Sequence, residues 1–296
     1  MNQKSDNSEV SKVILPIAGL GTRFLPLSKV LPKELFPLVD KPTVHYLVEE
    51  AKKSGISQIV FVLNSSKKAV LNYFKKSEEI EKILKKRKKD NLLRELKLFE
   101  ESIKDISISL AAQKKPLGDG HAILQAAKFI GQEAVGVLFG DDIVDGDEPA
   151  LLQLIKIFKT CQCPVIALKK LPKEKIPSYG VVAVEKIANR LYKIKKIIEK
   201  PEPSQAPSDL GICGKYILTP EVFNYLRKAV PSKKGEIILA EVLDKMLQDG
   251  KMIYGYEFKG NWLECGNKLE WLKSFFYFSL KDPRFGNELK EYLKTL

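Results

Sequence analysis

The segment from Ala18 to Arg23 follows a short apolar run and has the composition of a loop that holds phosphate. Glycines let backbone N–H groups approach phosphate oxygens closely, and an arginine adds a fixed positive charge. The segment is not a Walker A loop, because no Gly-Lys-Ser/Thr follows, and Phe24 replaces the third glycine of a dinucleotide fingerprint. Taken alone, it could also be an ordinary turn between a strand and a helix. Its residues are Ala18, Gly19, Leu20, Gly21, Thr22 and Arg23.

Prolines and a second cation continue this segment. Pro26 is followed by Pro32-Lys33-Glu34, and a further Pro-Leu-Val-Asp-Lys-Pro run ends at Pro42. Prolines restrict the backbone, so we expect a rigid loop that presents Arg23 and Lys33 to whatever the glycines hold. Two cations beside a loop rich in N–H donors suit a triphosphate.

The stretch from Gly19 to Pro42 resembles the sugar-nucleotide pyrophosphorylase family, and within it the bacterial uridylyltransferases. The resemblance implies Mg²⁺-dependent transfer of a nucleotidyl group from UTP to glucose 1-phosphate. It assigns Ala18 to Thr22 and Glu34 to nucleotide binding. Arg23 and Lys33 become catalytic residues that hold the triphosphate.

Further motifs of the family follow in the expected order. Gln113 and Gly118 stand where the family recognises the base, and Asp141 stands in the metal-binding turn Gly140-Asp141-Asp142. The sugar-phosphate site is implied by Tyr179-Gly180, Glu199-Lys200-Pro201 and Gly214-Lys215-Tyr216. There the glutamate would take sugar hydroxyls, and Lys200 would hold the attacking phosphate as a catalytic residue.

Three positions depart from the family pattern. Glu264-Cys265-Gly266 replaces the usual Asp-x-Gly, so we expect Glu264 to serve Mg²⁺ beside Asp141 with one extra methylene. The alternative is that Glu264 caps a helix beginning near Asn267. Asp119 replaces a leucine in the base-reading segment, and Glu236 to Glu241 lacks the family's polar side chains. These two changes bear on specificity more than on the type of reaction.

Each residue also has a structural interpretation. Asp141 and Asp142 could cap a turn, and Lys200 could be a surface lysine paired with Glu199. The ordered set of motifs, rather than any single residue, favours the catalytic interpretation.

The elements that position these residues alternate between strands and helices. Short apolar runs such as 13–17, 59–63 and 134–139 predict buried strands, and the intervening segments predict helices, including one long charged stretch at 78–99. We therefore expect an α/β fold with a Rossmann-like mixed, mostly parallel sheet flanked by helices. Residues 11–262 would form the nucleotidyltransferase domain, and 263–296 a helical C-terminal extension used for oligomerisation.

Composition and charge limit the partners and the cellular compartment that we expect for this protein. The net charge of +13 comes mainly from lysines on predicted helices without interleaved aromatics, so we expect anionic nucleotides rather than nucleic acid as partners. No run is long enough for a membrane helix, and Met1–Val10 lacks the apolar core of a signal peptide. Four scattered cysteines fit reduced thiols, so we expect a cytoplasmic protein. The helical C-terminal extension leads us to expect a homo-oligomer, either a dimer or a tetramer.

The interpretation with most support is a uridylyltransferase that makes UDP-glucose and pyrophosphate. Within the same class, dTTP or another sugar 1-phosphate is the alternative, although the helical insert at 78–100 is typical of the uridylyltransferases. A non-catalytic regulatory protein on the same fold is the alternative from another class, and Glu264 is the residue that favours it.

Overall fold

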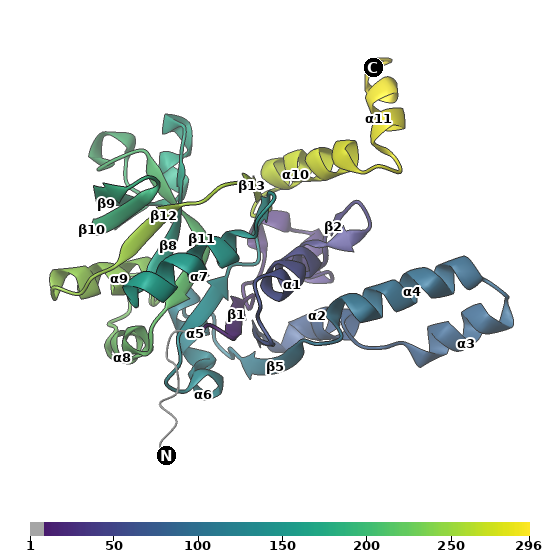
Figure 1. Ribbon diagram of the computed structural model, residues 1–296, viewed down its shortest axis with the longest axis horizontal. Helices are drawn as coiled ribbons and strands as arrows, with labels where there is room; N and C mark the ends of the chain where they lie inside the picture. Colours follow the sequence, from purple (N-terminus) through teal and green to yellow (C-terminus); the bar gives the residue numbers. More distant parts are fainter. Residues whose placement is uncertain (1–8) are drawn as a thin grey trace.

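The computed structural model describes residues 9–296 and shows a central sheet with helices on both faces and two projecting arms (Figure 1). Residues 1–8 lie outside the described residues. They include most of Met1–Val10, the segment in which the sequence shows no signal-peptide core. Among the residues described, no helix combines the length and apolar character needed to cross a bilayer.

The strands of the described chain form one nine-stranded sheet and two small ribbons. The sheet has the order β5-β4-β1-β6-β11-β8-β12-β10-β9, and β13 pairs with β7 while β2 pairs with β3. The strands are β1 (Lys12–Pro16), β2 (Pro37–Leu38), β3 (Lys41–Pro42), β4 (Gln58–Leu63), β5 (Ser107–Ala112), β6 (Val135–Leu138), β7 (Asp142–Asp145), β8 (Val165–Lys170), β9 (Gly180–Ala188), β10 (Leu191–Glu199), β11 (Leu210–Leu218), β12 (Tyr254–Glu257) and β13 (Asn261–Glu264).

Helices connect most of these strands. They are α1 (Thr43–Lys53), α2 (Lys68–Tyr73), α3 (Glu78–Lys86), α4 (Asp90–Ile103), α5 (Asp119–Gln125), α6 (Ala127–Ile130), α7 (Ala150–Cys161), α8 (Pro220–Lys228), α9 (Leu239–Gln248), α10 (Lys268–Lys281) and α11 (Gly286–Leu293). Short 3-10 turns are η1 (Thr22–Phe24), η2 (Leu27–Lys29), η3 (Lys33–Leu35), η4 (Ser65–Lys67), η5 (Lys173–Ser178) and η6 (Pro203–Gln205).

The sheet is mixed but runs mainly in one direction, as expected. β5, β4, β1 and β6 pair in parallel, and β8 pairs in parallel with β12. Only β10 and β11 run against the other strands of the sheet. Parallel strands bring their carboxyl ends to one edge, which is where α/β proteins bind ligands.

Two cores lie on opposite faces of the sheet. Alternation along β1 sends Ile14 to one face and Val13 and Leu15 to the other. Residues of α5, α8 and α9 cover the Ile14 face, and residues of α1 and α7 cover the Val13 face. A sheet buried on both sides explains why its strands read as continuous apolar runs.

The two arms differ in part from expectation. The charged stretch at 78–99 is not one helix but a hairpin, in which α3 ends at Lys86 and α4 begins at Asp90. Lys88, with φ 52°, reverses the chain between them. The C-terminal arm consists of α10 and α11, and β13 leads into it after crossing the boundary expected at 262/263 (Figure 1).

Candidate active site

The glycine-rich segment leaves the carboxyl end of β1 as the expected loop. Gly21 has φ 65°, and a Cβ added there would lie 3.3 Å from Ser28 Cβ, so glycine suits this position. η1 then carries Arg23, and η3 carries Lys33. The loop therefore places both predicted cations at the edge of the sheet.

Lys33 points at a carboxylate. Its ammonium donates to Asp141 Oδ2 at 2.7 Å, and both side chains are mostly buried. Burial favours the neutral form of Asp141, but Lys33 outweighs it and lowers the carboxyl pKa below its usual range. Asp141 is thus a carboxylate whose charge is already partly neutralised.

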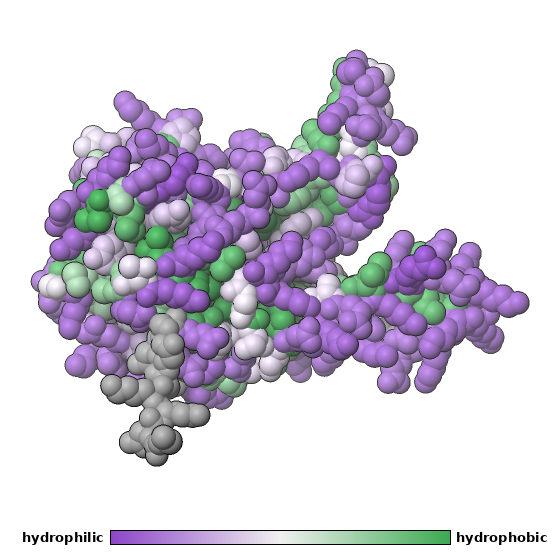
Figure 2. Space-filling model, viewed as in Figure 1, coloured by the Kyte–Doolittle hydropathy of each residue, from purple (hydrophilic) through white to green (hydrophobic). Residues whose placement is uncertain are grey.

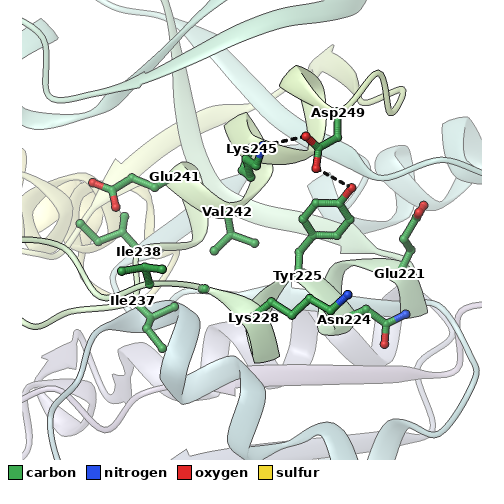
Figure 3. A pocket seen from close by; sticks show the side chains of 12 residues that line it. Glu221, Asn224, Tyr225, Lys228, Ile237, Ile238, Glu241, Val242, Lys245 and Asp249 are labelled. Atoms are coloured by element: carbon green, nitrogen blue, oxygen red, sulfur yellow. Dashed lines mark hydrogen bonds and ion pairs between the residues drawn. The ribbon is translucent and has the colours of Figure 1, made fainter.

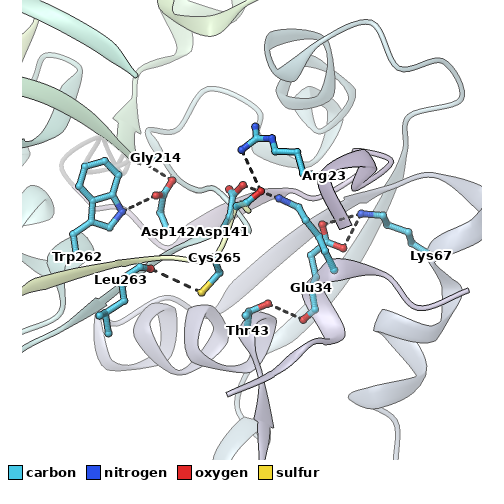
Figure 4. A network of polar contacts seen from close by, with 12 residues as sticks. Arg23, Glu34, Thr43, Lys67, Asp141, Asp142, Gly214, Trp262, Leu263 and Cys265 are labelled. Atoms are coloured by element: carbon cyan, nitrogen blue, oxygen red, sulfur yellow. Dashed lines mark hydrogen bonds and ion pairs between the residues drawn. The ribbon is translucent and has the colours of Figure 1, made fainter. Parts of the chain in front are cut away.

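Glu34, which was assigned to the nucleotide, lies in a different environment. Its side chain is 1% exposed, and both of its carboxylate oxygens accept hydrogen bonds from Lys67, at 2.8 and 2.7 Å (Figure 4). Thr43 donates to its backbone carbonyl. In this structure, Glu34 therefore braces the loop that carries Lys33, and its side chain does not face the cavity described below.

Asp142 stabilises the turn from inside. It accepts hydrogen bonds from Trp262 Nε1 at 2.7 Å and from the Gly214 N–H at 3.1 Å (Figure 4). A Cβ on Gly214 would lie 2.3 Å from Asp142 Oδ2, so only glycine fits. Burial, and then the charge of Asp141, raise the pKa of Asp142 to about 7. Gly214 thus supports the turn Gly140-Asp141-Asp142 from behind.

Glu264 reaches the same turn from β13, whose register pairs it with Asp142. The Tyr179 hydroxyl donates to Glu264 Oε2, and the Tyr179 ring packs at 4.9 Å against Trp262. A Cβ on Gly266 would lie 2.9 Å from Asp141 Oδ2 and 3.2 Å from Glu264 Oε1. The two carboxylates therefore converge on the space that Gly266 leaves free.

The capping alternative for Glu264 is wrong. Asn267 is the N-cap of α10, and its side chain accepts the backbone N–H of Glu270 at 3.0 Å. The Glu264 side chain instead turns toward Tyr179 and Asp141, as described above.

Four of the five expected sugar-phosphate residues, all except Gly214, meet at the open end of the β9–β10 hairpin. Gly180 on β9 pairs with Glu199 on β10, and the Lys200 N–H donates to the Tyr179 carbonyl at 3.1 Å. Lys200 has φ 48°, and its ammonium lies 3.1 Å from Glu199 Oε1. Its side chain is 57% exposed, so it remains free to meet an anion.

The expected base-reading residues form a second wall. Gln113 Nε2 donates to the Gly118 carbonyl at 2.9 Å and lies 2.9 Å from His121 Nδ1. Gly118 has φ 97°, and a Cβ there would lie 2.4 Å from the Ile237 carbonyl oxygen. Asp119 accepts hydrogen bonds from the N–H groups of Gly120 and Leu239. Burial is the main reason that the pKa of Asp119 rises to about 6.

A cavity of about 470 Å³ lies between the glycine-rich loop, the wall that contains Gln113 and Gly118 (here called the base wall) and the end of the hairpin at Glu199 and Lys200. Of the predicted residues, it brings together Ala18, Gly19, Leu20, Thr22, Arg23, Gln113, Gly118, Glu199 and Lys200. The predicted residues absent from its lining are Gly21, Lys33, Glu34, Asp141, Tyr179, Gly180, Gly214 and Glu264. Arg23 links the two groups, because it lines the cavity and donates to the Gly266 carbonyl at 3.1 Å.

Sequence reasoning missed several residues that hold the site. Lys67 and Trp262 carry no motif, and their partners Glu34 and Asp142 lie 33 and 120 residues away. Lys215 lies within a predicted motif, but its buried ion pair with Glu50, at 2.7 Å, was not foreseen. Asp119, in contrast, was marked in the sequence as a departure from the expected family pattern.

The fold and this arrangement define a nucleotidyltransferase, and the chain belongs to the nucleotidyl transferase family, whose profile matches residues 12–278. It is 39% identical over 288 residues to a UTP–glucose-1-phosphate uridylyltransferase of Staphylococcus haemolyticus, covering 97% of this chain and 99% of the relative. A UTP-bound UDP-glucose pyrophosphorylase of Acinetobacter baumannii superposes with a TM-score of 0.88 at 36% identity, covering 97% of this chain and 100% of that one. A UDP-glucose pyrophosphorylase complexed with UDP-glucose gives a TM-score of 0.83 at 34% identity, covering 93% and 100%.

Proposed function

We propose that the chain is a UTP–glucose-1-phosphate uridylyltransferase. The observation that carries the proposal is the 470 Å³ cavity, in which Arg23, Gln113 and Lys200 line one space. Relatives similar over nearly their whole length bear that name, and similar structures hold UTP or UDP-glucose. The non-catalytic alternative loses its main support, because the Glu264 carboxylate converges with Asp141.

The reaction needs positioning and charge neutralisation more than proton transfer. A phosphate oxygen of glucose 1-phosphate attacks the α-phosphorus of UTP and forms a P–O bond. The bond from that phosphorus to the bridging oxygen breaks, and pyrophosphate leaves with the electron pair. The attacking phosphate is already an anion, so no general base is required.

The residues divide between the two substrates. The backbone of Gly19 and Leu20 and the guanidinium of Arg23 hold the triphosphate. Gln113 and Gly118 hold the base, and Lys200 orients the attacking phosphate while Glu199 takes sugar hydroxyls. Lys33 acts through Asp141, to which it donates, instead of reaching the phosphates as the sequence suggested.

Asp141 and Glu264 fit a Mg²⁺ ion. Mg²⁺ prefers oxygen ligands and is commonly held by one or two protein carboxylates, with waters and substrate phosphates completing its shell. The described residues contain no group of three or more His, Cys, Asp or Glu side chains suited to a metal, but this mode of binding requires none. When bound, Mg²⁺ neutralises charge on the phosphates.

We also propose that the enzyme acts in the cytoplasm. The thiols of Cys161, Cys163, Cys213 and Cys265 are all free, which suits the reducing cytoplasm. We also propose a homo-oligomer built through the C-terminal arm.

The purified protein tests the function directly. With Mg²⁺, UTP and glucose 1-phosphate, it should form UDP-glucose, and EDTA in excess over the metal should stop the reaction. UDP-glucose formation that persists in EDTA would contradict the assigned role of Asp141 and Glu264.

A further inference from the structure

A second and larger cavity, of about 620 Å³, lies between α8 and α9 (Figure 3). None of the residues assigned to the substrates lines it. Its apolar surface comes from Ala229, Ile237, Ile238 and Val242, and the Tyr225 ring stands beside them. The volume lies within the range typical of small-molecule sites.

The charges around this cavity are mostly paired. Lys245 lies 2.7 Å from Asp249, which also accepts from the Tyr225 hydroxyl at 3.1 Å. Glu221 is paired with Lys251 at 2.6 Å. The remaining lining charges are two. Lys228 forms no ion pair with any described residue, and Glu241 points away from Tyr225 and Lys228 (Figure 3). The unpaired lining charges are therefore the Lys228 ammonium, on the same helix as Tyr225, and the Glu241 carboxylate, which points away from it (Figure 3).

A short strap, residues 236–239, separates this cavity from the substrate cavity. Ile238 lines both cavities, Glu236 only the substrate cavity, and Ile237 only the second one. Two backbone hydrogen bonds connect the strap to the base wall. The Ile237 carbonyl accepts the Gly120 N–H at 2.9 Å, and the Ile237 N–H donates to the Leu117 carbonyl at 2.8 Å.

A third hydrogen bond connects the N-terminus of α9 to the base wall. The Leu239 N–H donates to Asp119 Oδ1 at 3.0 Å, and Asp119 itself lines the substrate cavity. A ligand that displaces Ile237 or Ile238 must therefore also move the backbone that braces Gly118 and Gly120. The strap is therefore a wall shared by the two cavities, and a ligand in either cavity can change its position.

We propose that the cavity between α8 and α9 is a second ligand site for a small organic anion with a flat, apolar body. The body packs against Tyr225 and the aliphatic surface, and the anionic group pairs with Lys228. Through the 236–239 strap, the bound anion changes the affinity of the substrate cavity for its nucleotide.

Binding can be tested without any assay of activity. The probe is 1-anilinonaphthalene-8-sulfonate, which has a flat apolar body and one anionic group, titrated by its fluorescence. We expect one site per chain, a Kd at least 10-fold higher in Lys228→Glu, and loss of the site in Ala229→Trp, which fills the cavity. Lys234→Glu, which has the same charge change on an exposed residue outside the cavity, should bind as the wild type does.

Equal binding in Lys228→Glu and the wild type would overturn the site. Lys228 is an exposed residue in the last turn of α8, so this variant should fold even if Ala229→Trp does not. Near-UV circular dichroism of each variant confirms that the probe meets a folded protein.

Coupling is tested by measuring the Kd for UTP at increasing probe concentration. Coupled sites predict a change of about 5-fold or more that reaches a plateau when the second site fills. A Kd for UTP that rises without limit would mean simple competition in the substrate cavity. An unchanged Kd would mean that the strap transmits nothing. Either result would overturn the coupling, whereas absence of UTP binding at all would contradict the proposed function and leave the probe titration standing.

Discussion

At the scale of the residue, Lys200 is placed to act on a substrate rather than to support the fold. Its side chain lines the substrate cavity and is 57% exposed, and its one ion pair in the described chain is with its neighbour Glu199. The left-handed backbone at φ 48° is unusual for a lysine and sets its position relative to Tyr179. Strain of this kind is often found at functional sites.

Lys200→Ala should lower turnover by about 100-fold or more, because it removes one preorganised charge from the transition state. The Kd for UTP, measured by titration calorimetry, should hardly change. Lys195→Ala, which removes an exposed lysine of β10 that pairs with Glu185 of β9, is the matched control and should keep full turnover. A Lys200→Ala enzyme that loses UTP affinity but keeps its dependence on glucose 1-phosphate would mean that the two substrate sites are reversed.

Glu264 stands where the resemblance implies an aspartate, and its carboxylate lies beside that of Asp141. One carboxylate oxygen is held by Tyr179, and the other faces the space beside Asp141. The extra methylene of glutamate is thus accommodated by a tyrosine that fixes the side chain.

Glu264→Gln should lower turnover at least 10-fold at fixed Mg²⁺ and raise the Mg²⁺ concentration needed for half-maximal rate. The amide keeps the shape and can still accept from Tyr179, but it lacks the charge that attracts the metal. Glu264→Asp should keep substantial activity, because the carboxylate remains. An unchanged Mg²⁺ dependence in the Gln variant, seen in initial rates across a Mg²⁺ series, would remove Glu264 from the metal site.

At the scale of the element, the sequence predicted the strands but not which strands pair with each other. The runs that became β1, β4 and β6 are apolar because both faces of the sheet are covered, and that pattern is visible in sequence. β13 has only four residues, Asn261–Glu264, and is defined by pairing with β7, more than a hundred residues earlier. No local pattern could indicate that pairing.

The start of α9 shows how tertiary contacts override local preference. α9 begins only at Leu239, after the segment from Glu236 to Ile238. The backbone of Ile237 is instead bonded to Leu117 and Gly120 on the base wall. The candidate site shows the same limit of sequence analysis. The motifs predicted which residue types are present, but the contacts Lys33–Asp141 and Tyr179–Glu264 could be seen only in the structure.

Gly118→Ala should weaken UTP binding about 10-fold and lower the free energy of unfolding by about 1 kcal/mol or more. The added Cβ would lie 2.4 Å from the Ile237 oxygen, so the base wall must move. Gly131→Ala is the control, because it also has positive φ but nothing within 4 Å of the new Cβ. It should show the backbone strain alone, with normal UTP affinity; equal UTP affinity in the two variants would contradict the role of the base wall.

At the scale of the whole molecule, both arms carry exposed apolar side chains (Figure 2). One face of α10 packs Trp271, Phe275 and Phe278 around Leu38. Its other residues include Leu269 at 59%, Leu272 at 43% and Phe276 at 49% exposed. An apolar surface of this kind on a projecting helix suits association with a second copy.

Sedimentation equilibrium should therefore give a mass that is a multiple of 33.4 kDa. Phe276→Glu should reduce the mass toward that of one chain without lowering the melting temperature of the monomer core, because Phe276 is half exposed. Lys290→Glu, which changes charge on α11 without removing an apolar group, is the control. A wild-type protein that sediments as a single chain at micromolar concentration would rule out oligomerisation through this arm.

Pyrophosphate release measures which nucleotide and which sugar 1-phosphate the whole site selects. UTP, dTTP, ATP and GTP are each combined with glucose 1-phosphate, galactose 1-phosphate and mannose 1-phosphate at matched concentrations with Mg²⁺. We expect UTP with glucose 1-phosphate to have the highest kcat/KM of the set, because we assign the base to Gln113 and Gly118 and the sugar phosphate to Glu199 and Lys200. A preference for dTTP or ATP would contradict the uridylyl assignment while leaving the enzyme a nucleotidyltransferase. Absence of pyrophosphate release in every combination would contradict the proposed activity itself.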